Sequence, residues 1–178
     1  MSPILCPVKR SLWLWVVILA AVVATPLIAG PPKPESIKWM IVARFPGVSW
    51  LDASTLAGWM QDDARKDLLL LDVRTEEEYA VSHLRGAMRV DPERPELSEL
   101  PIPESATVVV YCSIGYRSAA LVGELRRRGV DQVYNLTGGI FGWANAGRPL
   151  FVDETRVEAV HPYDNMWGWL VRDDLRAY

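Results

Sequence analysis

The chain has 178 residues, half of them hydrophobic, which is enough for one globular domain with a short appendage. Its formal net charge of -3 provides no basic field, so nucleic acid is not an expected partner. Its two cysteines, Cys6 and Cys112, lie far apart, and no CxxC motif or Cys/His cluster is present, so a disulfide framework, a metal site and a cofactor are not expected.

The first 30 residues have the pattern of a membrane segment. After a flank over residues 1–10, which ends in Lys9-Arg10, residues 11–30 are almost wholly apolar. At about 1.5 Å per residue, this run is just long enough to cross a hydrocarbon core of roughly 30 Å. A retained single-pass anchor is favoured over a cleaved signal peptide, which has a similar pattern. Basic residues flank the run on both sides, so the positive-inside rule favours an extracytoplasmic domain only slightly.

A proline-rich linker is predicted over residues 31–38, and it is expected to be extended. The globular domain is expected over residues 39–150, where the apolar start at 37–45 fits either a strand or a short helix. The pattern assigns no structure to the tail over residues 151–178. Its tryptophans, Trp167 and Trp169, are expected to pack against the domain rather than to lie at a membrane interface.

Short apolar runs alternate with helical patterns inside the domain. Strands are predicted over 68–73, 86–90, 107–111 and 132–135, and helices over 55–60, 75–82, 118–128 and 140–146. Thr75 to Glu78 fits a capping box, the acidic run at 76–78 is interpreted as a solvated first turn, and Gly138-Gly139 as a tight turn. The alternation predicts an α/β fold, with a parallel sheet covered by helices on both faces.

Cys112 follows the strand at 107–111 and precedes the helix at 118–128. The carboxyl ends of parallel strands are where open α/β sheets bind ligands. Gly115 allows a sharp turn that would point backbone N–H groups at the sulfur, and Arg117 would add a positive charge nearby. Each feature favours the thiolate over the thiol. A lone cysteine after a strand is commonly an inert core residue, but the combination with Gly115, Arg117 and Ser118 favours a catalytic role.

Four motifs, taken in their order along the chain, resemble the successive signatures of a single rhodanese domain. They are Leu71-Asp72-Val73-Arg74-x-x-x-Glu78-Tyr79, Ser82-His83-Leu84-x-Gly86-Ala87, Val110-Tyr111-Cys112-x-x-Gly115-x-Arg117-Ser118 and Leu136-x-Gly138-Gly139-x-x-x-Trp143. The resemblance covers residues 48–149. It implies a three-layer fold with a five-stranded parallel sheet flanked by helices, and sulfur transfer through a cysteine persulfide.

The resemblance also implies roles for individual residues. Cys112 would be the sulfur-accepting nucleophile, and Asp72, Arg74 and His83 would support its loop structurally. The donor would be thiosulfate or a persulfide-like compound, and the acceptor would be a thiol, a cyanide-like compound or a protein. The substrate-binding cradle would consist of Ser113, Ile114, Gly115, Tyr116, Arg117 and Ser118, with Arg117 assisting an anionic donor. Members that use thiosulfate often carry basic residues in this loop, so the neutral Ser113 and Ile114 disfavour thiosulfate as the physiological donor.

The length of the loop separates two chemistries. Cys112 to Arg117 is a Cys-x4-Arg spacing, whereas the related cysteine phosphatases use Cys-x5-Arg because phosphate needs a wider ring of N–H donors. A membrane-anchored sulfurtransferase is therefore expected rather than a phosphatase or an arsenate reductase. The alternative is a catalytically inert rhodanese-like module that tethers a partner protein at a membrane.

Overall fold

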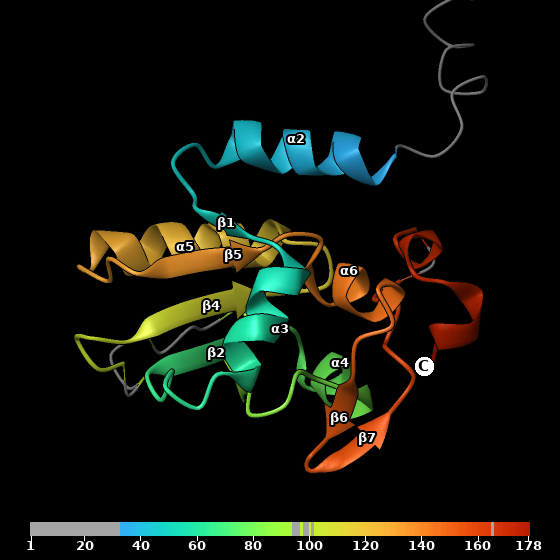
Figure 1. Ribbon diagram of the computed structural model, residues 1–178. Coiled ribbons are helices and arrows are strands. Elements are labelled where there is room, and N and C mark those ends of the chain that lie inside the picture. Colours follow the sequence, from blue (N-terminus) through green and yellow to red (C-terminus); the bar gives the residue numbers. More distant parts are fainter. Residues whose placement is uncertain (1–32, 94–96, 98–99, 101, 165) are drawn as a thin grey trace, which may run out of the picture. The chain divides into compact units, whose positions relative to one another are not determined.

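A five-stranded sheet forms the centre of the protein in the computed structural model, which describes residues 33–178 except 94–96, 98–99, 101 and 165. The strands are β1 (Trp50–Leu51), β2 (Leu68–Asp72), β3 (Met88–Arg89), β4 (Thr107–Tyr111) and β5 (Val133–Leu136). They lie in the order β1-β5-β4-β2-β3, and all neighbouring pairs are parallel (Figure 1). The predicted parallel α/β architecture is confirmed.

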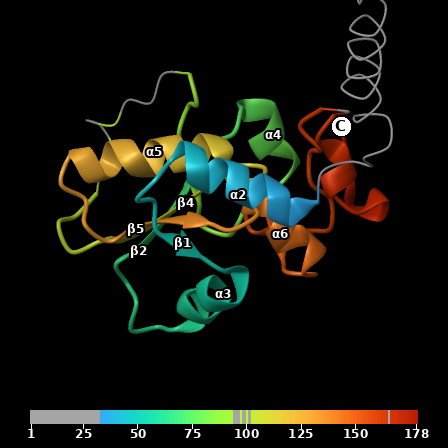
Figure 2. The same ribbon diagram turned by 90° about the horizontal axis from the view of Figure 1, so that it is seen from above.

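Helices cover both faces of this sheet because its strands are apolar on both sides. The helices are α2 (Pro34–Arg44), α3 (Ala53–Gln61), α4 (Glu76–Val81), α5 (Tyr116–Arg127) and α6 (Gly139–Asn145). In β4, Val109 and Tyr111 belong to one core cluster with residues of α3 and α6, while Val108 and Val110 belong to another with residues of α5. Figure 2 shows α5 and α3 on opposite sides of the strands. Alternate side chains of β4 thus pack against helices on opposite faces of the sheet, which gives a helix–sheet–helix arrangement of three layers.

The predicted linker is wrong over residues 34–38, because helix α2 begins at Pro34. A proline is tolerated in the first turn of a helix, where its missing N–H has no partner within the helix. Ile37 and Ile41, one turn apart, are buried and pack with Ala119 of α5. The apolar start at 37–45 is therefore a helix rather than a strand, and the folded part extends N-terminal to residue 39.

The C-terminal tail has definite structure and packs on the domain. An antiparallel hairpin of β6 (Leu150–Val152) and β7 (Thr155–Val157) is followed by two 3₁₀ helices, η1 (Gly168–Leu170) and η2 (Asp173–Leu175). The Asn145 side chain at the end of α6 donates to the Leu170 carbonyl at 2.6 Å and accepts from the Arg172 N–H at 3.0 Å. Trp167 and Trp169 pack beside Ile37 and Ile41, as predicted.

The expected flank over 1–10, the expected membrane segment over 11–30 and the first two linker residues lie outside the described residues. Within the part that the structure covers, none of the helices combines the length and the apolar character that crossing a bilayer requires.

Candidate active site

Cys112 lies directly after β4, with its side chain only 1% exposed. Its Sγ atom accepts a hydrogen bond from the Gly115 backbone N–H at 3.2 Å and one from the Ser118 hydroxyl at 3.5 Å. Gly115 makes this turn possible because it adopts a φ of 105°, in the left-handed region that favours glycine. Helix α5 then begins at Tyr116, two residues before its predicted start. The sulfur therefore lies at a helix N-terminus, where donors stabilise negative charge.

Helix α6 holds the backbone of the same loop from behind. The Ile140 N–H donates to the Cys112 carbonyl at 2.9 Å, and the Phe141 N–H donates to the Ser113 carbonyl at 3.1 Å. Gly139 permits this close approach, because a Cβ atom there would lie 2.3 Å from the Cys112 carbonyl oxygen. The predicted Gly138-Gly139 turn is present, with positive φ at both residues, and it also allows two backbone segments to touch.

Asn135 holds the loop from the neighbouring strand. Its side-chain amide, at the end of β5, donates to the Gly115 carbonyl at 2.8 Å, and the residue is fully buried. Sequence reasoning missed Asn135, although a polar residue inside an otherwise apolar strand is a signal that could have identified it. The carbonyls of Cys112, Ser113 and Gly115 are thus each fixed by a donor from outside the loop.

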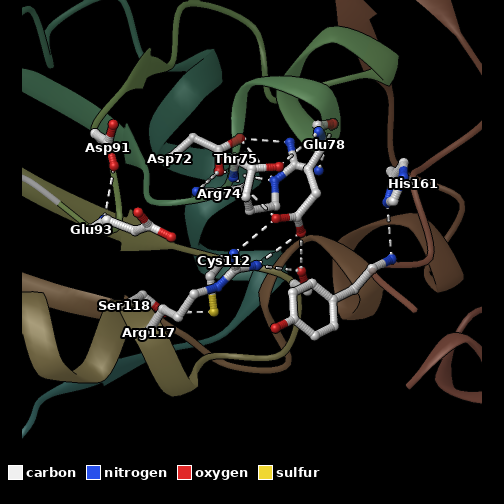
Figure 3. A network of polar contacts seen from close by, with 12 residues as sticks. Asp72, Arg74, Thr75, Glu78, Asp91, Glu93, Cys112, Arg117, Ser118 and His161 are labelled. Carbon is white, nitrogen blue, oxygen red and sulfur yellow. Dashed lines mark hydrogen bonds and ion pairs between the residues drawn. The ribbon is translucent and has the colours of Figure 1, made fainter. Parts of the chain in front are cut away.

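The Arg117 guanidinium forms an ion pair with the Glu78 carboxylate. Its guanidinium donates to both Glu78 oxygens at 2.8 Å and to the Ser113 hydroxyl at 2.9 Å. Ser113 in turn donates to Glu78 at 2.7 Å, so the three side chains form one closed network. Figure 3 shows the Arg117 side chain directed at Glu78. Arg117 therefore supplies a positive charge near the loop, as expected, but Glu78 compensates that charge, which weakens the expected assistance to an anionic donor.

Glu78 is buried, whereas the sequence predicted that it would lie in a solvated first turn. Its side chain is 2% exposed, although the predicted capping box with Thr75 is present. Burial raises the pKa of Glu78, but the hydrogen bonds and charge of Arg117 and the Ser113 hydrogen bond outweigh it, so the pKa falls below its ordinary value. Burial lowers the pKa of Arg117, yet Glu78 and the Cys112 sulfur raise it above its ordinary value. Both groups are charged at neutral pH.

Asp72 and Arg74 form a second, fully buried pair below this network. Arg74 binds both oxygens of Asp72, with Nη2 to Oδ2 at 2.6 Å and Nε to Oδ1 at 2.9 Å. The same guanidinium donates to the Glu78 carbonyl at 3.1 Å and to the Ser82 carbonyl at 2.6 Å, so it binds the backbone of α4 at its middle and at its C-cap. Figure 3 shows Arg74 and Glu78 side by side. The pair therefore orients Glu78, and Glu78 orients Arg117 and Ser113.

His83 is held by Tyr79 and by the C-terminal hairpin. Its ring stacks on Tyr79 with the centroids 4.0 Å apart, and its Nδ1 atom is 3.2 Å from the Tyr79 carbonyl. Its backbone pairs in both directions with Phe151 of β6, at 2.8 and 2.9 Å. This position suits a structural residue that joins α4 to the C-terminal hairpin.

A cavity of about 220 Å³ opens over Cys112. Four of the predicted loop residues line it together with Cys112, namely Ser113, Ile114, Tyr116 and Arg117. Three further residues, Met40 of α2 and Tyr163 and Trp167 of the tail, complete the wall and were not predicted. Within the described residues, no group of three or more His, Cys, Asp or Glu side chains could hold a metal ion. The site is a nearly buried sulfur beneath a small opening.

Comparisons with known proteins agree with this geometry. A family model for the rhodanese-like domain matches residues 52–146. A sulfurtransferase of Allochromatium vinosum is 33% identical over 107 residues, which cover 60% of this chain and 98% of that protein. A tRNA uridine(34) hydroxylase of Xylella fastidiosa is 34% identical over 128 residues, which cover 62% of this chain and 48% of that protein. The crystal structure of a thiosulfate sulfurtransferase from Pseudomonas aeruginosa has a TM-score of 0.54 at 27% identity, and the match covers 66% of this chain and 22% of that one.

Proposed function

This chain belongs to the rhodanese-like domain family, and on that premise we propose that it is a sulfurtransferase that carries sulfane sulfur as a persulfide on Cys112. The observation that supports this most directly is the place of the sulfur. Sγ lies at the end of β4, accepts the Gly115 N–H at 3.2 Å, and lies beneath a cavity open to solvent. The arrangement stabilises a sulfur anion and leaves it one direction from which to react.

The reaction has two displacement steps. The Cys112 thiolate attacks the outer sulfur of the donor, a new S–S bond forms at Sγ, and the electron pair of the broken bond leaves with the donor. Thiosulfate would leave as sulfite, and an organic persulfide as a thiolate. A thiolate, cyanide or a protein thiol then attacks the terminal sulfur and regenerates the Cys112 thiolate. Neither step requires an oxidant, and the anion at each stage can accept the Gly115 N–H.

The environment of Arg117 supports sulfur transfer over phosphate chemistry. A phosphatase needs its loop arginine to contact the oxygens of the phosphate. Here the guanidinium is held by both Glu78 oxygens at 2.8 Å, and Glu78 is itself buried. Sulfur transfer needs no such contact, because the persulfide that forms on Cys112 carries a single negative charge that backbone donors can stabilise.

The test is mass spectrometry of the full chain after incubation with thiosulfate or an organic persulfide. We expect the gain of one sulfur atom, which cyanide removes. Cys112→Ala should abolish the gain, and Cys6→Ala, which changes the only other cysteine, should preserve it. A folded wild-type protein that gains no sulfur from any donor would contradict the proposal, as would a Cys112→Ala protein that gains as much.

We also propose that residues 11–30 anchor the domain in a membrane, with the domain on the extracytoplasmic side. The support is the apolar composition of this run, which is long enough to cross the hydrocarbon core. The full chain should remain with membranes after alkaline extraction, whereas a chain that begins at residue 33 should be released. Protease added to intact cells or spheroplasts should degrade the domain, and complete protection would place it on the other side.

A further inference from the structure

The opening of the cavity over Cys112 is built in part by segments outside the region that matches the family model. That match covers residues 52–146. Met40 comes from α2, which lies along α5 in Figure 2, while Tyr163 and Trp167 come from the tail. Met40 and Tyr163 are each nearly half exposed, at 49% and 44%, although both are large and apolar. These three residues, which we call the rim, therefore come from the segments that flank the matched region.

The rim surrounds an opening that offers a substrate no uncompensated positive charge. Apart from the reactive Cys112, Arg117 is the one charged side chain among the described residues that line the cavity, and both of its terminal nitrogens contact the Glu78 carboxylate at 2.8 Å. The remaining wall is aromatic or aliphatic, apart from the Ser113 hydroxyl. A compact dianion such as thiosulfate would lose its hydration here and gain little attraction in return.

Tyr163 is held at the opening by its backbone. It has a φ of 70°, which is unfavourable for a bulky residue and persists only where the surrounding structure imposes it. The Tyr163 N–H donates to His161 Nδ1 at 3.1 Å, and Asp164 accepts from the Trp167 N–H at 2.8 Å. The tyrosine ring lies over the Arg117 guanidinium, 4.9 Å from its centre. The ring thus covers one face of the Arg117 guanidinium.

We propose that Met40, Tyr163 and Trp167 select donors whose sulfane sulfur is carried by an apolar organic group. This rests on the proposed sulfur transfer. The group would occupy the rim while the outer sulfur reaches Sγ, and the bond between that sulfur and the rest of the donor would break. The electron pair would leave with the organic fragment, as a sulfinate or a thiolate. The cavity, at about 220 Å³, is below the ~300–1,000 Å³ of pockets for drug-sized ligands, so a single ring or a short alkyl chain is the right size.

The experiment compares two donors of equal charge, benzenethiosulfonate and methanethiosulfonate, with the full chain. Each kcat/KM is divided by the rate constant for the uncatalysed reaction of the same donor with a small free thiol. This ratio corrects for the difference in intrinsic reactivity between the two donors. We expect a corrected preference for the benzene compound of about tenfold. Tyr163→Asn should remove most of it, since asparagine tolerates a positive φ but supplies no ring, and Tyr163→Phe should keep it.

A second pair of variants tests the other side of the rim. Met40→Gln keeps the length of the side chain but makes its end polar, so it should also lower the preference. Trp39→Gln changes a neighbour on α2 that is more exposed, at 72% against 49% for Met40, and that does not line the cavity, so it should leave the preference as it is. The inference is wrong if the wild-type protein gains sulfur from both donors but shows no corrected preference. It is also wrong if Tyr163→Asn and Met40→Gln both retain the wild-type preference. In either case the proposed function stands. If no donor transfers sulfur, both are wrong.

Discussion

Gly139→Ala would separate α6 from the loop that carries Cys112. The added Cβ atom would lie 2.3 Å from the Cys112 carbonyl oxygen and 2.6 Å from that of Ser113, closer than any stable contact. Both neighbours are backbone atoms, so neither can rotate away. The two segments must move apart, which breaks the hydrogen bonds from Ile140 and Phe141 to these carbonyls, now 2.9 and 3.1 Å long.

The size of the effect follows from two contributions. Alanine at the left-handed φ of 57° costs about 1–2 kcal/mol. Two lost backbone hydrogen bonds add about 1 kcal/mol each. The total of about 3–4 kcal/mol is less than the ~5–15 kcal/mol stability of a typical domain, so the variant should still fold. Because the loop is displaced, sulfur loading should slow by about 100-fold.

Urea unfolding gives the stability, and the rate of persulfide formation on Cys112 gives the activity. Gly86→Ala is the matched control, because Gly86 has a similar φ of 72° but a Cβ atom there would meet nothing within 4 Å. It should cost only about 1–2 kcal/mol and load sulfur normally. If Gly139→Ala is no less stable than Gly86→Ala and loads sulfur at the wild-type rate, the proposed support of the loop by α6 is refuted.

Two further predictions concern the buried charges. Glu78→Gln should flatten the pH dependence of stability: the pKa of Glu78 is lowered from its ordinary 4.5, so its stabilisation is complete above that value and is lost as pH falls through the folded-state pKa. The difference in urea midpoint between wild type and Glu78→Gln should therefore shrink from about pH 7 to about pH 3, and a constant difference would contradict it. Asp72→Asn should cost about 3–5 kcal/mol in urea unfolding, because it leaves the Arg74 charge buried and unpaired. Asp174→Asn, which breaks the exposed pair with Arg172, should cost much less because water screens that pair, and equal losses would argue against the buried charge as the cause.

Local patterns predicted the elements that have a strong local cause. The strand Thr107–Tyr111 has the predicted bounds because five consecutive residues are buried on both faces of the sheet. The Thr75 capping box forms as expected, since both of its hydrogen bonds lie within one turn. By contrast, β1 has only two residues, Trp50 and Leu51, and no periodicity can be read from a run that short. It forms because β5 offers it an edge to pair with.

The parts of the site that sequence reasoning missed depend on contacts between distant residues. Glu78 and Arg117 are 39 positions apart, so the local pattern of three glutamates favoured a solvated turn. Tyr163 and Trp167 reach the cavity only because the tail folds back over the domain. The loop from Cys112 to Ser118 could be identified from the sequence because its residues are consecutive and their types are chemically specific. The residues around the cavity opening could not, because tertiary packing brings them together.

The residues that contact the Cys112 sulfur and the residues of the rim come from different parts of the chain, and this has an evolutionary consequence. Cys112, which we propose as the nucleophile, its hydrogen-bond donors and the two ion pairs all lie between residues 72 and 118, well inside the family match, whereas Met40, Tyr163 and Trp167 lie outside it. With the role that we propose for the rim, changes in the segments that flank residues 52–146 would alter which compounds gain access without disturbing the groups that contact the sulfur. A grafted terminus from a related protein would be a direct way to redirect the same chemistry to a new source of sulfur.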